Sequence, residues 1–317
     1  MNRLSFVLVS LLVACGGGGD GGGTITPTGP HHQYVVSKAN VPTTATQVTQ
    51  FGLDLGAPKT NKQDGQVDNA LGTTLSTLSL MHINVQGGID TAVNDGSIIL
   101  LVDVQTESFD SSNAAGMKVS LGDNPTPAPC TNDADPLTCG QHLKGTGMFS
   151  IAANSPTDAA LTGTITGGTF DGGPGDVTLQ ISLGEGDPIT LALHGARAEV
   201  SGITDTGIAT AKIGGAVSQS DINGQVIPAV AAQITPIITR DCPTPAAPDC
   251  MCVSGSTGAT VLSLLDTDHD CTVTVTEIQN NSLIKSLLGP DVCIEDSCDK
   301  PDALSIGISA TAVAATF

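Results

Sequence analysis

The 317-residue sequence contains no tryptophan, a single tyrosine (Tyr34) and six phenylalanines. Because aromatic side chains are the usual stacking surfaces for sugars and bases, this scarcity argues against a lectin. Basic residues are also few: 11 lysines and arginines stand against 31 aspartates and glutamates, for a formal net charge of −20. Such a chain has little with which to neutralise phosphates, so we expect no nucleic-acid partner. The same acidity favours the binding of cations.

The apolar segment near the N-terminus, from Leu4 to Leu12, is too short to span a bilayer. It follows the cation Arg3 and leads into Leu12-Val13-Ala14-Cys15, an arrangement that resembles the signal peptide (residues 1–14) and lipobox of bacterial lipoproteins. The resemblance implies cleavage before Cys15, acylation of that cysteine, palmitate included, and anchoring to a membrane. Gly16, in place of aspartate, implies the outer membrane. An ordinary secretory signal with a chance cysteine is the alternative.

A glycine-rich stretch follows the lipidation site, so residues 15–32 are interpreted as a tether. Flexible coil of the length of residues 16–30 spans roughly 20–25 Å on average. This would hold a folded body clear of the membrane. We divide the rest of the chain into a β-rich body with helices (33–240), a cysteine-rich segment (241–302) and a closing strand (303–317) that returns to the body.

Short β-branched and apolar segments alternate with glycine-rich turns through the middle of the chain, which predicts an antiparallel meander. The predicted strands are residues 98–104, 117–121, 148–152, 161–170, 177–183, 189–194, 196–203 and 208–213. A 3.6-residue spacing predicts a helix over 84–93, whose apolar face consists of Val85, Ile89, Ala92 and Val93.

Eight cysteines follow Cys15, and an even number in an exported chain predicts four disulfides. Cys130 and Cys139 lie in one proline-rich loop, and we expect them to pair with each other. The remaining six allow fifteen connectivities; they are Cys242, Cys250, Cys252, Cys271, Cys293 and Cys298. A zinc site using Cys250, Cys252 and His269 is the alternative.

Residues 266–277 have the sequence D-T-D-H-D-C-T-V-T-V-T-E. Acids at alternate positions, closed by a glutamate at position twelve, resemble the calcium loop of the EF-hand family. Val273 stands where that family places an inward apolar anchor. The resemblance implies a Ca²⁺ cofactor with oxygen ligands from Asp266, Asp268, Asp270, Thr272, Thr274 and Glu277. An acidic surface loop without a metal is the alternative.

One position departs from the family pattern. Position six is normally glycine because its backbone takes a positive φ, and here it is Cys271. We expect a disulfide, with Cys252 as the preferred partner, to enforce that conformation. A weaker second match is interrupted by Pro301 and is interpreted as a metal-free acidic loop; its acids are Asp291, Glu295, Asp299 and Asp302.

Together these patterns predict an α+β fold. Its body is an antiparallel β-rich sandwich or curved sheet with a few helices, followed by a C-terminal helix-loop-helix unit of EF-hand type. The sequence contains no nucleophile elbow, zinc-protease motif or phosphate-binding loop, so a non-enzymatic role is favoured.

The predicted function is that of a calcium-binding cell-surface lipoprotein with a structural or partner-binding role, in which calcium stabilises the C-terminal segment. The expected partners are the membrane, through Cys15, and an unidentified protein or surface. One alternative is a secreted hydrolase with catalytic residues in the loops of residues 112–144. Another is a dockerin-like adhesion module, which would need a second intact loop.

Overall fold

The computed structural model describes residues 25–56, 59–60, 62–80, 84–156, 160–181, 189–243, 245–247 and 249–317. The predicted signal peptide, the lipidation site at Cys15 and the tether up to residue 24 lie outside these ranges. Among the described helices, none has both the length and the apolar character needed to cross a membrane.

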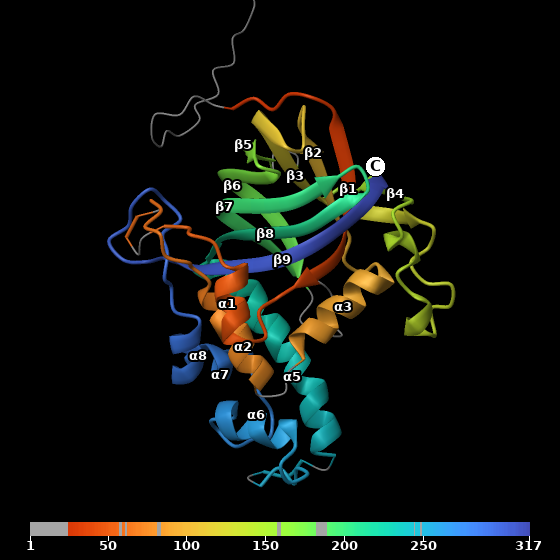
Figure 1. The fold of residues 1–317 in the computed structure, drawn as a ribbon. Coiled ribbons are helices and arrows are strands. Elements are labelled where there is room, and N and C mark those ends of the chain that lie inside the picture. The colour runs from red at the N-terminus through yellow and green to blue at the C-terminus, as the bar shows by residue number, and fades with distance from the viewer. Residues whose placement is uncertain are drawn as a thin grey trace, which may run out of the picture.

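Eight antiparallel strands form a closed barrel, and a ninth strand lies against it (Figure 1). Around the ring, β1 pairs with β2, then β3, β5, β6, β7, β8 and β9, and β9 pairs again with β1. The ring strands are β1 (His31–Asn40), β2 (Leu100–Gln105), β3 (Ser111–Thr126), β5 (Ala160–Thr166), β6 (Thr169–Ile181), β7 (Ile189–Thr204), β8 (Gly207–Ser218) and β9 (Ala303–Thr316). The extra strand β4 (Gly147–Ile151) pairs antiparallel with β3 and parallel with β9.

The prediction of an α+β sandwich or curved sheet with an EF-hand unit is wrong. The fold is mostly β, its sheet closes into a barrel, and 28% of the protein is helical. The last strand, β9, pairs on both sides, which removes both free edges of the sheet. The exit helix expected after Glu277 is also interrupted. Its first part, α7 (Val275–Asn280), ends at the extended residue Asn281, and a separate helix α8 (Ser282–Leu287) begins there.

Side chains that alternate along the strands fill the barrel interior. They include large, fully buried residues from five strands: Tyr34, Met117, Leu121, Leu161, Ile165, Phe170, Leu179, Leu191 and Leu193. The Tyr34 hydroxyl donates a hydrogen bond to the Thr204 carbonyl oxygen over 2.8 Å, which satisfies the one polar atom of this side chain. The interior is therefore a packed hydrophobic core.

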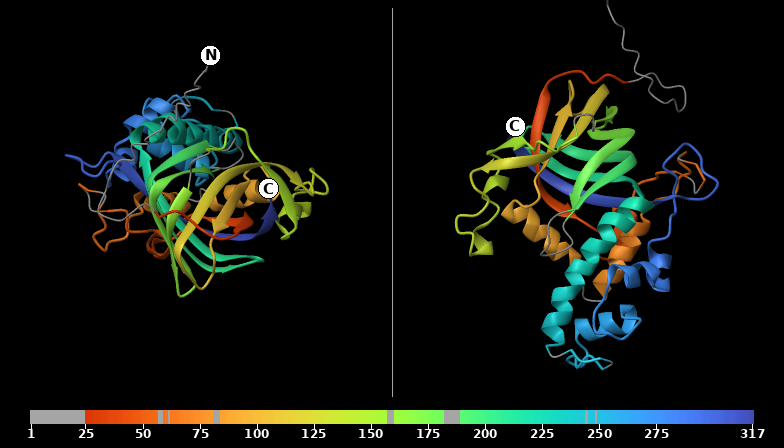
Figure 2. Two further views of the ribbon diagram at one scale, coloured as in Figure 1. Left: turned by 90° about the horizontal axis from the view of Figure 1, so that it is seen from above. Right: turned by 180° about the vertical axis from the view of Figure 1, so that it is seen from behind.

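Helices gather at one end of the barrel (Figures 1 and 2). In chain order they are α1 (Ala45–Phe51), α2 (Ala70–Leu80), α3 (Val85–Asp95), α4 (Gln219–Asp221), a π-helical turn η3 (Ile222–Val226), α5 (Ile227–Asp241), α6 (Thr257–Leu265), α7 and α8. The predicted helix over 84–93 is confirmed as α3, with all four predicted apolar residues buried. Two short 3₁₀ turns, η1 (Pro136–Thr138) and η2 (Gln141–Leu143), lie between β3 and β4.

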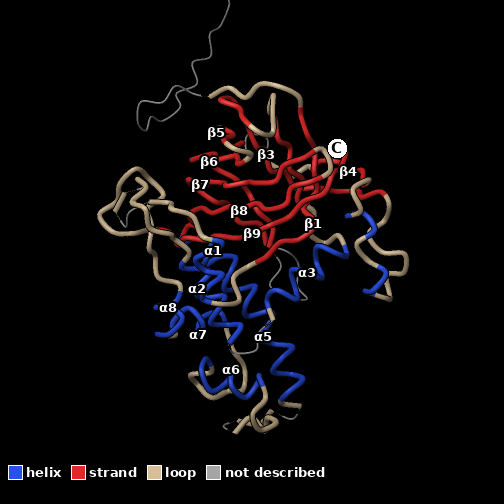
Figure 3. The backbone as a smooth tube through the Cα atoms, in the orientation of Figure 1, coloured by secondary structure: helices blue, strands red, loops and turns tan. Residues whose placement is uncertain are grey.

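Residues 219–302 form an excursion between two neighbouring strands (Figure 3). Ser218, the last residue of β8, is the register partner of Ala303, the first residue of β9. The excursion therefore leaves and re-enters the barrel at one point. Its apolar residues, such as Ile222 and Ile278, belong to the same core cluster as the barrel interior.

The buried histidine of η2 predicts a pH-dependent stability. His142 is 0% exposed and packs edge-on to Phe149 with ring centroids 6.0 Å apart. Burial lowers the pKa of His142 from its usual 6.5. As the pH falls below that value, the unfolded chain takes up a proton that the folded chain binds only at lower pH, so stability is full above 6.5 and declines below it.

We expect His142→Phe to flatten the decline of the melting temperature between about pH 7 and pH 5. The readout is the slope from circular dichroism melts, because the substitution also alters packing and hence the absolute melting temperature. His142→Gln, which also cannot titrate, should give the same flat profile. A slope equal to that of the wild type in both variants would contradict the assignment.

Candidate metal site

The acidic loop predicted from residues 266–277 lies between α6 and α7. Ser256 caps α6 by accepting a hydrogen bond from the Ala259 N–H, and the helix buries Val261, Leu262 and Leu265. Asp266 follows the last helical residue. Val273, at loop position eight, is 7% exposed and joins the same core, as its apolar character predicts. The start and the middle of the loop are thus fixed by packing.

The three aspartates expected to bind a cation come together. One carboxylate oxygen each from Asp266, Asp268 and Asp270 lie within 4.8 Å of one another, and these residues form the one such acidic group found in the described parts of the chain. Asp266 is only 5% exposed, and its two oxygens accept the N–H groups of Asp270 and Cys271 at 3.2 and 3.0 Å. The outer two aspartates are exposed. One buried and two exposed carboxylates therefore face a common point.

Partial desolvation, followed by repulsion from Asp270, Glu277 and Asp266, raises the pKa of Asp268. A bound cation would relieve this repulsion. Carboxylate oxygens grouped in this way suit a hard dication such as Ca²⁺, which takes oxygen ligands.

The other three predicted ligands are hydrogen-bonded within the loop. The Thr272 N–H and hydroxyl donate to Asp270 Oδ1 at 2.8 and 2.7 Å. Glu277 lies outside the three-aspartate group. Its Oε2 accepts the Thr274 N–H and hydroxyl, both at 2.9 Å, and its Oε1 accepts the Thr267 N–H at 2.8 Å. Burial opposes ionisation of Glu277, but these hydrogen bonds outweigh it and lower the pKa of its carboxyl group.

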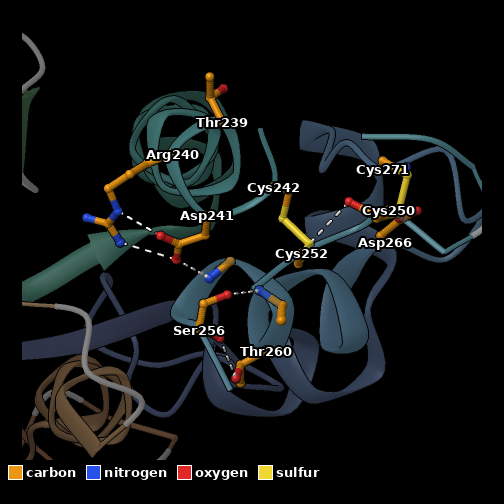
Figure 4. The surroundings of a disulfide bond; sticks show 12 residues. Thr239, Arg240, Asp241, Cys242, Cys250, Cys252, Ser256, Thr260, Asp266 and Cys271 are labelled. Carbon is orange, nitrogen blue, oxygen red and sulfur yellow. Dashed lines mark hydrogen bonds and ion pairs between the residues drawn. A yellow bond between two sulfur atoms is a disulfide. The ribbon is translucent and has the colours of Figure 1, made fainter. Parts of the chain in front are cut away.

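The loop backbone adopts the conformation expected at position six. Cys271 has φ 71° and His269 has φ 59°. Both lie in the left-handed region, which residues other than glycine rarely adopt. Cys271 forms a disulfide with Cys250 (Figure 4). The predicted partner Cys252 is wrong: Cys252 pairs with Cys242 at the end of α5. Cys250 and Met251 take positive φ values of 51° and 44°, in a turn that no sequence pattern indicated.

All eight cysteines of the described residues form disulfides, which confirms the predicted number of four bridges. Cys130 pairs with Cys139, as expected from their shared loop, and Cys293 pairs with Cys298. The zinc alternative is wrong because the thiols of Cys250 and Cys252 are oxidised. In the weaker second acidic loop, Asp291 accepts bonds from Ser305 and Asp302 accepts one from the Ile294 N–H.

Asp241, which the sequence analysis missed, joins the ends of two helices (Figure 4). Its Oδ2 accepts the Gly258 N–H in the first turn of α6 at 2.8 Å, while its Oδ1 accepts from the Arg240 guanidinium at 2.7 Å. Arg240 and then the Gly258 N–H lower the pKa of this carboxyl group. Asp241 thereby fixes α6, and with it the start of the acidic loop of residues 266–277, to α5. Thr267, which donates to Glu277, was missed as well.

Comparisons with family models, curated proteins and solved structures found no match to this chain. Its role is therefore argued from its own residues.

The positive φ of Cys271 gives a test of the loop conformation. Removing the Cys250–Cys271 bridge should lower the free energy of unfolding by about 2–5 kcal/mol. The double variant Cys250→Ala/Cys271→Gly should be more stable than Cys250→Ala/Cys271→Ala by about 1 kcal/mol, because glycine accepts the left-handed backbone without steric cost. Urea unfolding of both variants measures the difference.

The Cys293–Cys298 bridge provides a control. It spans 5 residues whereas Cys250–Cys271 spans 21, so loop-closure entropy predicts a smaller loss of unfolding free energy when both of its cysteines become alanine.

Equal stability of the Cys271→Gly and Cys271→Ala double variants would contradict the left-handed conformation at residue 271.

Proposed function

We propose that this protein is a calcium-binding lipoprotein of the cell envelope, in which Ca²⁺ bound at residues 266–277 stabilises the cysteine-rich segment. The observation that carries the proposal is the convergence of Asp266, Asp268 and Asp270 within 4.8 Å in a loop whose sixth residue is left-handed. Carboxylates at positions one, three and five of a tight loop are the core of a calcium site.

The remaining ligands of the proposed site are close in sequence and space. The Thr272 carbonyl adds a backbone oxygen, and Thr274 contributes directly or through water. Glu277 exchanges its hydrogen bonds to Thr267 and Thr274 for bidentate contact with the ion. This exchange costs hydrogen-bond energy, so we infer an affinity in the range of extracellular calcium modules, with a Kd of roughly 10⁻⁴–10⁻³ M.

The proposed role of the ion is structural. A ligand that binds only the folded state stabilises it by mass action, by about 1.4 kcal/mol when its concentration is about ten times Kd. Extracellular calcium is abundant enough for such a weak site. A sensor role is less suited to this loop, because the Cys250–Cys271 bridge and buried Val273 restrain any opening movement.

The proposed location rests on the N-terminal sequence alone, where acylation of Cys15 would anchor the barrel to the outer membrane. The role proposed for the barrel is structural or partner-binding. No observation favours the hydrolase alternative. The one histidine in its loops of residues 112–144 is His142, and this side chain is fully buried. We therefore put forward no second function.

Calcium titration of the chain from residue 25 onward tests the metal site. We expect saturable binding and a rise in melting temperature of about 3–5 °C at saturating calcium relative to chelator. Asp266→Ala and Glu277→Ala should abolish both effects. The control Asp133→Ala removes an exposed acid outside the loop and should preserve them. If the two loop variants keep the wild-type affinity and the calcium-dependent shift, the proposed site is wrong.

Membrane fractionation tests the anchor. We expect the full-length chain, expressed in a Gram-negative host, to be found in the outer-membrane fraction, and Cys15→Ala to be released from it because acylation requires the thiol. Ser10→Ala changes the same leader without removing that thiol and should leave fractionation unaltered. A Cys15→Ala protein that still fractionates with the membrane would contradict the anchor.

A further inference from the structure

A cleft with a volume of about 460 Å³ lies on the excursion, apart from the metal loop. One wall comes from α4, η3 and the start of α5, with Gln219, Asn223 and Ile227. The opposite wall comes from α7, α8 and the residues after them. A volume of this size is typical of sites for small molecules.

The two walls are connected at the cleft. Gln279 on α7 donates a hydrogen bond from Nε2 to the Asn223 carbonyl oxygen over 3.2 Å. That carbonyl belongs to the π-helical turn η3, which lies one turn before Pro228. Proline lacks an N–H, and the wider turn accommodates it within a continuous helical path. The Gln279–Asn223 hydrogen bond connects the two walls of the cleft.

The charge of the cleft is opposite to that of the protein. Among the described residues that line it, Lys285 is the one ionisable group, in a chain with a net charge of −20. Its Nζ lies 3.4 Å from Asn280 Oδ1, and no carboxylate of the described residues forms an ion pair with it. This exposed ammonium group, whose hydrogen-bond partner is a neutral amide, lies beside a concave surface and suits a single negative charge.

The rest of the lining combines an aliphatic surface with an unused acceptor. Ile227 is 3% exposed, and Ile284 and Leu288 are half-buried on the opposite wall. Gln219 Oε1 is buried without a hydrogen-bond partner among the described residues. A buried acceptor left unpaired costs free energy, which a ligand N–H or O–H could recover after a small rotation of this side chain.

We propose that this cleft binds a small aliphatic carboxylate that also carries a hydrogen-bond donor. The carboxylate pairs with Lys285, the aliphatic group packs on Ile284 and Leu288, and the donor reaches Gln219. A phosphate dianion is a poorer fit, because one lysine on a strongly acidic protein neutralises only one charge. The inference does not require the metal, although α7 begins at the end of the metal loop.

N-acetyl-L-leucine is a suitable probe, since it has a carboxylate, an amide N–H and a branched aliphatic group. Methyl NMR of the chain from residue 25 onward should show saturable shifts at Ile227, Ile284 and Leu288. The neutral N-acetyl-L-leucinamide should bind more weakly. Lys285→Gln should weaken binding of the acid by about three- to tenfold and leave the amide unaffected. Gln219→Leu, which removes the acceptor, should weaken both probes.

Lys300→Gln is the matched control, since it removes an exposed lysine outside the cleft and should change neither affinity. The titrations are run with calcium and with chelator. Saturable cleft shifts in either condition support the site, so a failed metal proposal and a failed cleft are distinguishable. The proposal is overturned if the cleft methyl groups show no saturable shift in either condition, or if the acid and the amide bind equally and Lys285→Gln has no effect.

Discussion

Closure of the barrel by β9 is the constraint on which the rest of the structure depends. This strand contains the last residues of the chain and pairs with β1, the first strand, as well as with β8. Before β9 docks, β1 and β8 each present an unpaired edge. Closure thus joins the two ends of the described chain. It also fixes Ser218 opposite Ala303, so the whole excursion of residues 219–302 is attached to the barrel at one point of the sheet.

An excursion attached at one point needs internal contacts to keep a defined shape. Three kinds are present. Apolar residues of its helices extend the barrel core, the Cys242–Cys252 and Cys250–Cys271 bridges connect α5 to the acidic loop of residues 266–277, and Asp241 connects α5 to α6. The acidic loop is therefore held by a fixed frame, and a structural rather than a signalling role for the proposed calcium ion agrees with this. The cleft between η3 and α8 lies on the same frame.

Local features were predictable from the sequence where one short-range pattern decides them. Most strand positions followed from β-branched and apolar segments between glycine-rich turns, although the predicted strand 161–170 runs across the turn between β5 and β6. The helix α3 followed from its four apolar residues. The convergence of the three aspartates also followed from their spacing, and the Cys130–Cys139 bridge from their shared loop.

Features that depend on distant partners were not predictable. Barrel closure needs a consistent tilt and stagger of eight strands, which no alternation pattern encodes. The single strand β7 was predicted as two strands, 189–194 and 196–203. A bulge at Gly195, with φ 56°, interrupts the alternation of inward and outward side chains without ending the strand. Cys250, rather than Cys252, pairs with Cys271, and it lies in a turn where Cys250 and Met251 have positive φ although neither is glycine. The cleft residues meet only in three dimensions, since Gln219 and Lys285 are far apart in the chain.

Hydrogen–deuterium exchange with calcium and with chelator tests directly whether calcium stabilises the segment around residues 266–277, because exchange is measured segment by segment. We predict that calcium slows exchange in residues 257–288, which include α6, the acidic loop, α7 and α8, and leaves exchange in the barrel strands β2 to β7 unchanged. Calcium-independent exchange in residues 257–288, or protection confined to the barrel, would contradict it.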